Sequence, residues 1–469
     1  MDGFTSFIRE EAEALARPGA LDCMIGSECC FLNHGGLGSP PRAIVELRRH
    51  AEDLCEKQPM RWCRDEAPRL VSRARSALCD YLSISDPARL VLTSNASAAI
   101  FSVLQSVALA PGDVVLTTET VYHSVGDALR HLCARAGAVV HTVPLLPPGL
   151  GGVRDEAQML GAWEAGLDGA MRLAAAGGEG RDGGSGGRVA IAVLDHISSK
   201  PSAVFPAAAM VAACAARGVP TLVDGAHAPG SLSEEELQLD ALGADFYAMN
   251  FHKWMHAPRP CAALYVRYPA AGGVAWIDHS RLTPKVLPPG PPALSKEASY
   301  VTDVLTQGHY DESTRDYAHF VVLHACVELA RRLEEPFQRH RAEMVPFTVR
   351  ALRDACGTGD GAPDIIPAER CAAMATVRMP TARMMRVLLQ PSDPSGRSLD
   401  GAVSAIKLTK GVLKERLLTE FGIEVPVFVF RGELFLRVSL PLYVQRPAIT
   451  RLAQALSTLL AAGPGTSRL

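Results

Sequence analysis

The sequence predicts an α/β protein whose larger domain is a mostly parallel sheet flanked by helices. Apolar β-type runs alternate with helical stretches from about residue 43 to 265, which implies crossover units. Short runs such as Val114–Thr117 lack polar alternation, as strands covered on both faces do. The chain has 469 residues, so two or three domains are expected, and its hydrophobic fraction of 48% is ordinary for a globular protein.

The elements of the large domain can be assigned in order along the chain. The expected strands are Leu90–Thr93, Val114–Thr117, Val139–Val143, Val189–Leu194, Thr221–Val223, Phe246–Met249 and Ala262–Val266. The expected helices between them include Ala96–Leu109, Ser124–Ala136 and Ala207–Ala216. Residues 164–188 are Gly-rich and end in a low-complexity tract, so we expect a flexible surface insertion there.

We expect three parts in the chain: an N-terminal segment over 1–42, a large domain over 43–296, and residues 297–469. The Pro-rich run 280–296 is an expected extended connection. The last part should hold an interdomain helix and a smaller α+β C-terminal domain. Its expected elements are a helical pattern at 315–356, strands near 371–378, 425–430 and 434–439, and a final helix at 447–461.

Charge and composition narrow the function classes. A net charge of −3 gives no broad attraction to nucleic acid or to an acidic membrane surface, and no run approaches the roughly 20 apolar residues of a membrane span. The 12 cysteines form no CxxC pair and no zinc-like cluster, which favours a reducing, cytoplasmic location without a metal. The chain ends in Ser467-Arg468-Leu469, close to the SKL peroxisomal address; a chance ending is the alternative.

One lysine stands at the end of an expected strand. The segment Asn250-Phe251-His252-Lys253-Trp254 directly follows Phe246–Met249. A lysine placed there can meet a bound aldehyde, although an ordinary surface lysine explains the spacing equally well.

A carboxylate precedes this lysine by 29 residues, about one strand-helix-strand unit. The strand at Thr221–Val223 runs into Asp224 and then into small residues and His227. Ligands of open α/β sheets bind beyond the carboxyl ends of strands. A carboxylate beside a pyridinium nitrogen keeps that nitrogen protonated, which makes the ring an electron sink. Asp224 alone is more often a cap or turn residue, but Asp224, His227 and Lys253 together indicate one site.

A third segment offers a phosphate site. Thr93-Ser94-Asn95-Ala96-Ser97-Ala98-Ala99-Ile100 is a strand end followed by small residues that open a helix. The free N–H groups and the positive dipole end of such a helix suit a phosphate, and Ser97 adds a hydroxyl. Simple capping by Ser94 or Asn95 is a compatible alternative.

With these residues in place, the sequence resembles the class V aminotransferase group of fold-type I pyridoxal-phosphate (PLP) enzymes. The resemblance is to the isopenicillin N epimerase-like and cysteine C–S lyase-like branch. It runs from Phe31-Leu32-Asn33-His34-Gly35-Gly36 to Arg437, and DGAHAPG followed by HKW is its specific part. The resemblance implies PLP as cofactor, a small amino-acid substrate and a homodimer with shared active sites.

The resemblance also implies roles for individual residues. Lys253 matches the lysine that holds PLP as a Schiff base, Asp224 the partner of the pyridinium nitrogen, and His227 the residue near the phenolic oxygen. The positions that match the phosphate cup are the backbone of Ala96, Ser97, Asn250 and His252. Tyr122 matches the ring that stacks on the cofactor, and a one-residue slip would put His123 there instead.

Further positions match residues near the substrate. His196 falls beside the substrate and the ring oxygen, with a satisfied buried histidine as the equal alternative. Arg437 matches the arginine that binds the substrate α-carboxylate through its planar fork, with a surface cation as the alternative. Asn33, Trp62 and the 276–310 region would shape the side-chain pocket, although Trp62 is more simply a core residue.

One segment implies a contact between subunits. Ser313-Thr314-Arg315-Asp316 resembles the GTRD stretch in which the threonine reaches the phosphate of the neighbouring subunit. The sequence departs from the family pattern at Ser313, and also at Ala98 and Pro260. These departures leave cofactor binding intact but put substrate specificity and local loop shape in doubt.

The reaction is predicted from what each route requires. Persulfide transfer needs a cysteine shortly before the carboxylate-binding arginine, but the last cysteine is Cys371, at the head of a strand-like run. β-Elimination needs only the lysine and a good leaving group, which favours a carbon–sulfur β-lyase acting on cysteine or a cysteine conjugate or sulfoxide. Epimerisation is the runner-up and needs a second acid or base, for which Tyr122, His123 and His196 are candidates. A non-catalytic PLP-fold binding or scaffold protein is the alternative from another class.

Overall fold

The computed structural model describes residues 3–16, 22–147, 155–177, 187–267, 316–358, 365–389 and 402–461. Several predictions from sequence lie outside these residues. They are residues 313–315 of the GTRD-like stretch, the low-complexity tract at 178–186, the whole 276–310 region with its Pro-rich run 280–296, and the C-terminal tripeptide.

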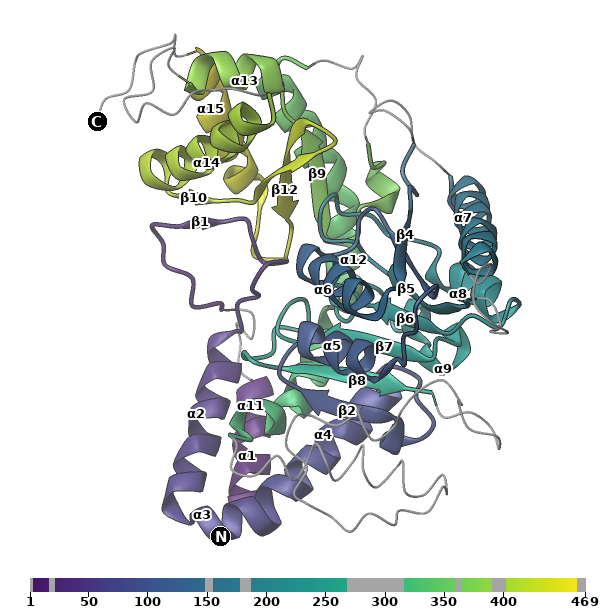
Figure 1. The fold of residues 1–469 in the computed structure, drawn as a ribbon. Helices are drawn as coiled ribbons and strands as arrows, with labels where there is room; N and C mark the ends of the chain where they lie inside the picture. Colours follow the sequence, from purple (N-terminus) through teal and green to yellow (C-terminus); the bar gives the residue numbers. More distant parts are fainter. Residues whose placement is uncertain are drawn as a thin grey trace.

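The large domain is built on a seven-stranded sheet of order β2-β8-β7-β6-β5-β3-β4 (Figure 1). Its strands are β2 (Leu90–Thr93), β3 (Val114–Thr118), β4 (Val139–Val143), β5 (Val189–Asp195), β6 (Thr221–Asp224), β7 (Phe246–Asn250) and β8 (Ala262–Val266). Strand β8 runs antiparallel to both β7 and β2, while the neighbouring pairs from β7 to β4 are parallel. The predicted α/β class and all seven predicted strands are confirmed.

The sheet separates two clusters of buried side chains, as a doubly covered sheet requires. Helices α5 (Ala96–Ser106) and α6 (His123–Ala136) pack on one face. Helices α7 (Glu156–Ala176) and α8 (Ala207–Ala215) pack on the other, and short α9 (Leu239–Leu242) contacts α8. The expectation of a flexible insertion over 164–188 is wrong for residues 164–176, which form the second half of α7.

The C-terminal part holds the expected smaller domain. Its antiparallel sheet has the order β11-β12-β9, with β9 at Met374–Arg378, β11 at Val427–Phe430 and β12 at Glu433–Ser439. The 34-residue helix α12 (Leu323–Cys356) contacts this domain as well as helix α4 (Ala67–Tyr81) of the large domain. Three more helices complete the domain: α13 (Thr381–Leu388), α14 (Ala402–Phe421) and α15 (Arg446–Ala461).

The N-terminal region reaches both domains. Helices α1 (Gly3–Ala16) and α2 (Arg42–Lys57) pack on each other near α4 and short α11 (Ala318–Val321), and the chain between α2 and α4 forms α3 (Pro59–Arg61) and the π-helical turn η1 (Trp62–Glu66) (Figure 1). Strand β1 (Cys30–Phe31) pairs in parallel with β10 (Ile423–Glu424) of the small domain. Trp62 is 1% exposed, so it is a core residue and not part of a substrate pocket.

Short 3-10 turns complete the assignment: η2 (Pro87–Arg89), η3 (Glu235–Leu237) and η5 (Ala368–Arg370). Among the helices that the structure describes, none is both long and apolar enough to cross a bilayer.

Candidate active site

The three residues of the central prediction meet at the carboxyl edge of the large sheet. Asp224 ends β6, and Lys253 lies three residues beyond the end of β7. The Nζ atom of Lys253 is 3.3 Å from Nε2 of His227, while the indole N–H of Trp254 donates to Nδ1 of His227 at 3.4 Å. Because Nδ1 accepts, the proton of the neutral imidazole is assigned to Nε2.

Burial controls the charge of this lysine. Removal from water lowers the pKa of Lys253 from 10.5 to about 8; the Asp224 carboxylate raises the pKa and the Arg437 guanidinium lowers it. Burial also holds the pKa of His227 well below its usual range, so the imidazole is neutral. An amine with this pKa is nucleophilic toward an aldehyde near neutral pH.

A second carboxylate, which the sequence argument did not single out, lies beside Asp224. Asp195 ends β5 and is paired in register with Asp224 on the neighbouring strand. Its Oδ2 accepts hydrogen bonds from the hydroxyls of Thr118 at 3.3 Å and Thr120 at 3.1 Å, while Oδ1 of Asp224 accepts from the N–H of Ala226 at 3.0 Å. Burial raises the pKa of both carboxyls, and Asp224 raises that of Asp195 further. The two neighbouring carboxyls therefore oppose each other's ionisation, while the charge of Lys253 favours the ionised form of Asp224. The sequence signal was available: an acidic residue ends this apolar strand as Asp224 ends the next.

The N-terminal Asn-His-Gly-Gly loop holds the backbone that carries the lysine. His34 is fully buried; its Nε2 lies 2.9 Å from the carbonyl oxygen of Lys253, and its Nδ1 lies 2.9 Å from the hydroxyl of Tyr443. Four residues later the loop passes so close that a Cβ on Gly38 would lie 2.5 Å from the carbonyl oxygens of both His252 and Lys253. Only glycine permits this approach, and the loop thereby fixes the position of Lys253.

The start of α5 has the donors that a phosphate needs, with one change from expectation. The N–H of Ala96, expected to face the phosphate, donates instead to Oδ1 of Asn250 at 2.9 Å. The N–H of Ala98 donates to the capping Asn95 at 2.8 Å. Among the described residues no partner is found for the N–H and hydroxyl of Ser97, which remain available. His252 follows Asn250 by two residues, and its Nδ1 lies 2.8 Å from the carbonyl oxygen of Cys261.

A cavity of about 190 Å³ opens beside Lys253. Arg437 lies on its wall, only 2% exposed; its Nη1 donates to the Ser199 hydroxyl at 2.8 Å and its Nη2 to Oδ1 of Asn33 at 3.0 Å. Its Nε has no hydrogen-bond partner, and no carboxylate lies within ion-pair distance in the part of the chain that the structure describes. Burial lowers the pKa of Arg437 to about 10, so the group stays charged. A buried guanidinium without a counter-ion needs an anionic ligand.

Of the remaining predicted residues, Tyr122 lines this cavity, and His123 and His196 do not. Tyr122 caps α6, is 36% exposed and lines the cavity; the ring of His123, with its centroid 4.3 Å away, is not part of the described wall. His196 does not line the cavity, and its Nδ1 is bonded to the hydroxyl of Tyr247 at 2.8 Å. The structure therefore places Tyr122 on the cavity wall, where its stacking role stays a prediction, and gives His196 the hydrogen-bond partner of a buried histidine.

These residues fit PLP. Lys253, with its lowered pKa, interacts with the Asp224 carboxylate and shares a cavity with buried Arg437, while Asn250, three residues before Lys253, bonds the start of α5, where Ser97 has free donors. In the part of the chain that the structure describes, no group of three His, Cys, Asp or Glu side chains could hold a metal ion.

Solved structures of other proteins share the fold of this chain. The chain covers 99% of the cystine C–S lyase C-DES in complex with cysteine persulfide, with a TM-score of 0.63 at 18% identity over 93% of this chain. It also resembles the cysteine desulfurase of Thermococcus onnurineus, with a TM-score of 0.65 at 15% identity, covering 94% of this chain and 97% of that one. At these identities the likeness concerns the fold.

Sequence comparisons agree with the resemblance found in the sequence. The family described as "Aminotransferase class-V" matches residues 60–161 and 186–275. A probable chloroplastic L-cysteine desulfhydrase of Arabidopsis thaliana is 28% identical over 92% of this chain and 83% of its own length. Isopenicillin N epimerase of Streptomyces clavuligerus is 29% identical over 91% of this chain and 94% of its own. Over these residues the chain resembles the class V aminotransferase family of PLP enzymes, and the two relatives agree with the isopenicillin N epimerase-like and cysteine C–S lyase-like branch expected from the sequence.

The packing of the glycine loop predicts the effect of one methyl group. Gly38→Ala should displace the backbone at Lys253 and weaken PLP binding by about tenfold, because the new Cβ would collide with two carbonyl oxygens. Fluorescence titration of the apoprotein with PLP measures this change. Gly161→Ala, where a Cβ meets no atom within 4 Å, is the matched control and should bind PLP as the parent does. Unchanged affinity in Gly38→Ala would contradict the loop's role.

The lowered pKa of Lys253 predicts the pH dependence of PLP uptake. The neutral amine reacts, so the uptake rate should rise with pH up to about 8 and level off above it, instead of rising to 10.5. Asp224→Asn removes the carboxylate that raises this pKa and should move the plateau to lower pH. Stopped-flow absorbance across pH checks both; a plateau near 10.5 would contradict the burial argument.

Proposed function

We propose that this chain is a PLP-dependent carbon–sulfur β-lyase acting on L-cysteine or on a cysteine conjugate or sulfoxide. The observation that carries the proposal is that one cavity holds both the Lys253 amine and the Arg437 guanidinium, which has no carboxylate partner among the described residues. In the reaction the α-proton is removed and the bond from Cβ to sulfur breaks, with the sulfur group leaving as sulfide from cysteine, as a thiol from a thioether conjugate, or as a sulfenic acid from a sulfoxide. Water completes the reaction to pyruvate and ammonia.

Each residue of the site has a task in this reaction. Bound PLP would supply an electron sink for the negative charge that develops at Cα. Asp224 would hold the proton of the pyridinium nitrogen, His227 would lie at the phenolic oxygen, and the Ser97 N–H would bind the phosphate. Arg437 would orient the α-carboxylate so that the α-proton faces Lys253. Lys253, whose pKa is lowered to about 8, would take that proton at Nζ.

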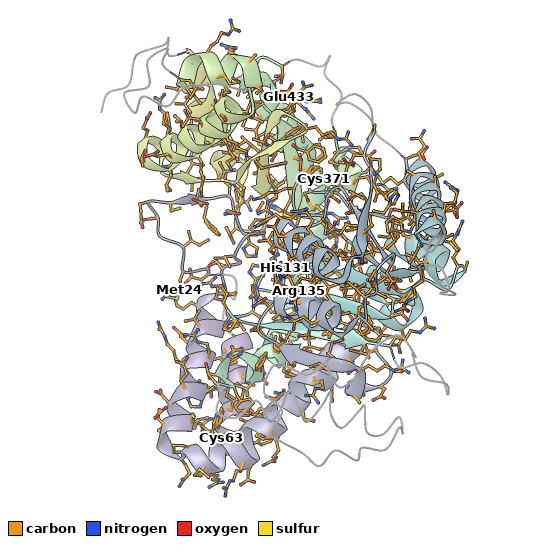
Figure 2. All side chains as sticks on the ribbon, viewed as in Figure 1. Met24, Cys63, His131, Arg135, Cys371 and Glu433 are labelled. Atoms are coloured by element: carbon orange, nitrogen blue, oxygen red, sulfur yellow. The ribbon has the colours of Figure 1, made fainter. Side chains whose placement is uncertain are left out.

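The position of the cysteines argues against persulfide transfer. No cysteine lies on the described wall of the cavity. Cys371, the last in the sequence, is 2% exposed and buried ahead of β9. Cys63 is exposed, but it lies on the helical end of the molecule, away from Glu433 in the small domain (Figure 2). Of the relatives, the plant desulfhydrase is named for C–S cleavage, which supports the lyase.

Amino-acid epimerisation is the second candidate, and one observation favours it. The phenol of Tyr122 lies on the cavity wall, where it could return a proton to the face of Cα opposite Lys253. The relative from Streptomyces clavuligerus is named for that reaction. β-Elimination is favoured because it needs no second acid.

We further infer the setting in which the site works. Lys253 would hold PLP as a Schiff base, and Thr314 would reach the phosphate bound by a second copy, so that a homodimer forms complete sites. A cytoplasmic location fits the abundance of unpaired cysteines.

An absorption spectrum tests the proposed function directly. The purified protein loaded with PLP should show a visible band that Lys253→Ala abolishes, and L-cysteine should change the band with release of pyruvate. A band change with racemised amino acid and no pyruvate would favour the epimerase. A protein that binds PLP but changes no substrate offered would favour the binding or scaffold alternative, and no band at all would overturn the cofactor assignment.

The buried guanidinium predicts different effects on binding and on stability. Arg437→Met should weaken binding of the amino acid by about 100-fold, because the charged hydrogen bonds to the α-carboxylate are lost. The Tm of the free protein should change little, because relief of a buried charge without a counter-ion offsets the loss of the hydrogen bonds to Ser199 and Asn33. Calorimetric titration with L-cysteine and a thermal melt measure the two effects. A large fall in Tm with unchanged affinity would mean that Arg437 is structural.

A further inference from the structure

Two lysines lie on the wall of the same cavity as Arg437. Lys200 follows Ser199, the residue whose hydroxyl and carbonyl oxygen accept from the guanidinium of Arg437. Lys414 lies on α14 of the small domain, and Lys410 is one helical turn earlier on the same helix. The two wall lysines therefore come from different domains and meet at one cavity.

These cations have no acidic partner among the described residues. No ion pair within 4.0 Å involves Lys200, Lys410 or Lys414 in the part of the chain that the structure describes. The cavity wall carries one carboxylate, Glu424, and its Oε1 accepts a hydrogen bond from the amide of Asn33 at 3.1 Å. The cations also act on one another: besides burial, Arg437, Lys410 and Lys414 each lower the pKa of Lys200. Positive charge therefore exceeds negative charge around the cavity.

Depth separates the two kinds of cation. Arg437 is 2% exposed at the inner wall, whereas Lys200 and Lys414 are exposed at the mouth. With Arg437 assigned to the α-carboxylate of the amino acid, Lys200 and Lys414 are left without an anionic ligand. Without an anionic ligand these lysines repel one another across the opening, and water and Glu424 offset the repulsion only in part.

We propose that the preferred substrate carries a second anionic group, a carboxylate on its side chain, which Lys200 and Lys414 bind at the mouth of the cavity. The inference rests on the proposed function, because it assigns the α-carboxylate to Arg437. The substrate class is then an amino acid whose sulfur substituent bears an acid, instead of L-cysteine itself. Binding of the second anion also bridges the two domains through these lysines.

A pair of nearly isosteric probes tests the charge requirement. S-carboxymethyl-L-cysteine and S-carbamoylmethyl-L-cysteine differ in one negative charge, and calorimetric titration of the PLP-loaded protein gives a Kd for each. The acid should bind about tenfold more tightly than the amide, and this preference should shrink as salt rises because the lysines are exposed.

Variants assign the preference to the lysines. Lys200→Gln and Lys414→Gln should each reduce the preference for the acid, and the double variant should remove it while affinity for the amide stays the same. Lys200→Arg should retain it. Lys407→Gln is the matched control, because Lys407 is exposed on the same helix α14 and is not part of the described cavity wall. Thermal melts confirm that each variant is folded.

The outcomes separate this inference from the proposed function. Equal affinity for the two probes, or a preference that survives in the double variant, would overturn the second anion site. A lysine-dependent preference without release of pyruvate would support the anion site and overturn the lyase. Pyruvate from both probes at equal efficiency would support the lyase and overturn the anion site.

Discussion

The site depends on charges that are buried together at the carboxyl edge of the large sheet. Lys253 and Arg437 are cations removed from water, and Asp224 is the carboxylate whose charge acts most directly on Lys253. In a medium of low dielectric constant such charges interact over several ångströms, so their arrangement sets the protonation of each. The amine of Lys253 is reactive because burial and Arg437 together outweigh Asp224. Shifting any one of the three would change the pKa of Lys253.

The same guanidinium joins three parts of the chain. Arg437 belongs to β12 of the small domain, Ser199 to the loop after β5 of the large domain, and Asn33 to the N-terminal loop. Next to Asn33, the ring of His34 bonds the carbonyl oxygen of Lys253, so the segment that positions the arginine also positions the lysine. The relative placement of the two domains is therefore coupled to the distance between the two functional cations.

The sequence predicted what is local and missed what is made by distant contacts. Asp224 and Lys253 could be found because strand ends are visible in the hydrophobic pattern, and parallel strands bring their carboxyl ends together. The role of Gly38 could not be found, because its closeness to residues 252 and 253 exists only after folding. The glycines of 164–176 suggested flexibility, but they belong to helix α7. A Cβ at Gly166 would lie 2.4 Å from the Val143 side chain, so glycine at this position lets α7 pack against β4. The site roles of Thr314 and of the other matched residues stay predictions.

The unpaired Nε of Arg437 and the crowded lysines are local conflicts that a sequence selected for stability alone would not keep. The free energy lost by burying an uncompensated guanidinium in the free protein is recovered when an anion binds, so the conflict contributes to affinity. The same reasoning applies with less force at the mouth, where water screens the lysines. The cations at the two depths therefore have different tasks. Buried Arg437 binds the α-carboxylate that all amino acids share, and exposed Lys200 and Lys414 discriminate among side chains.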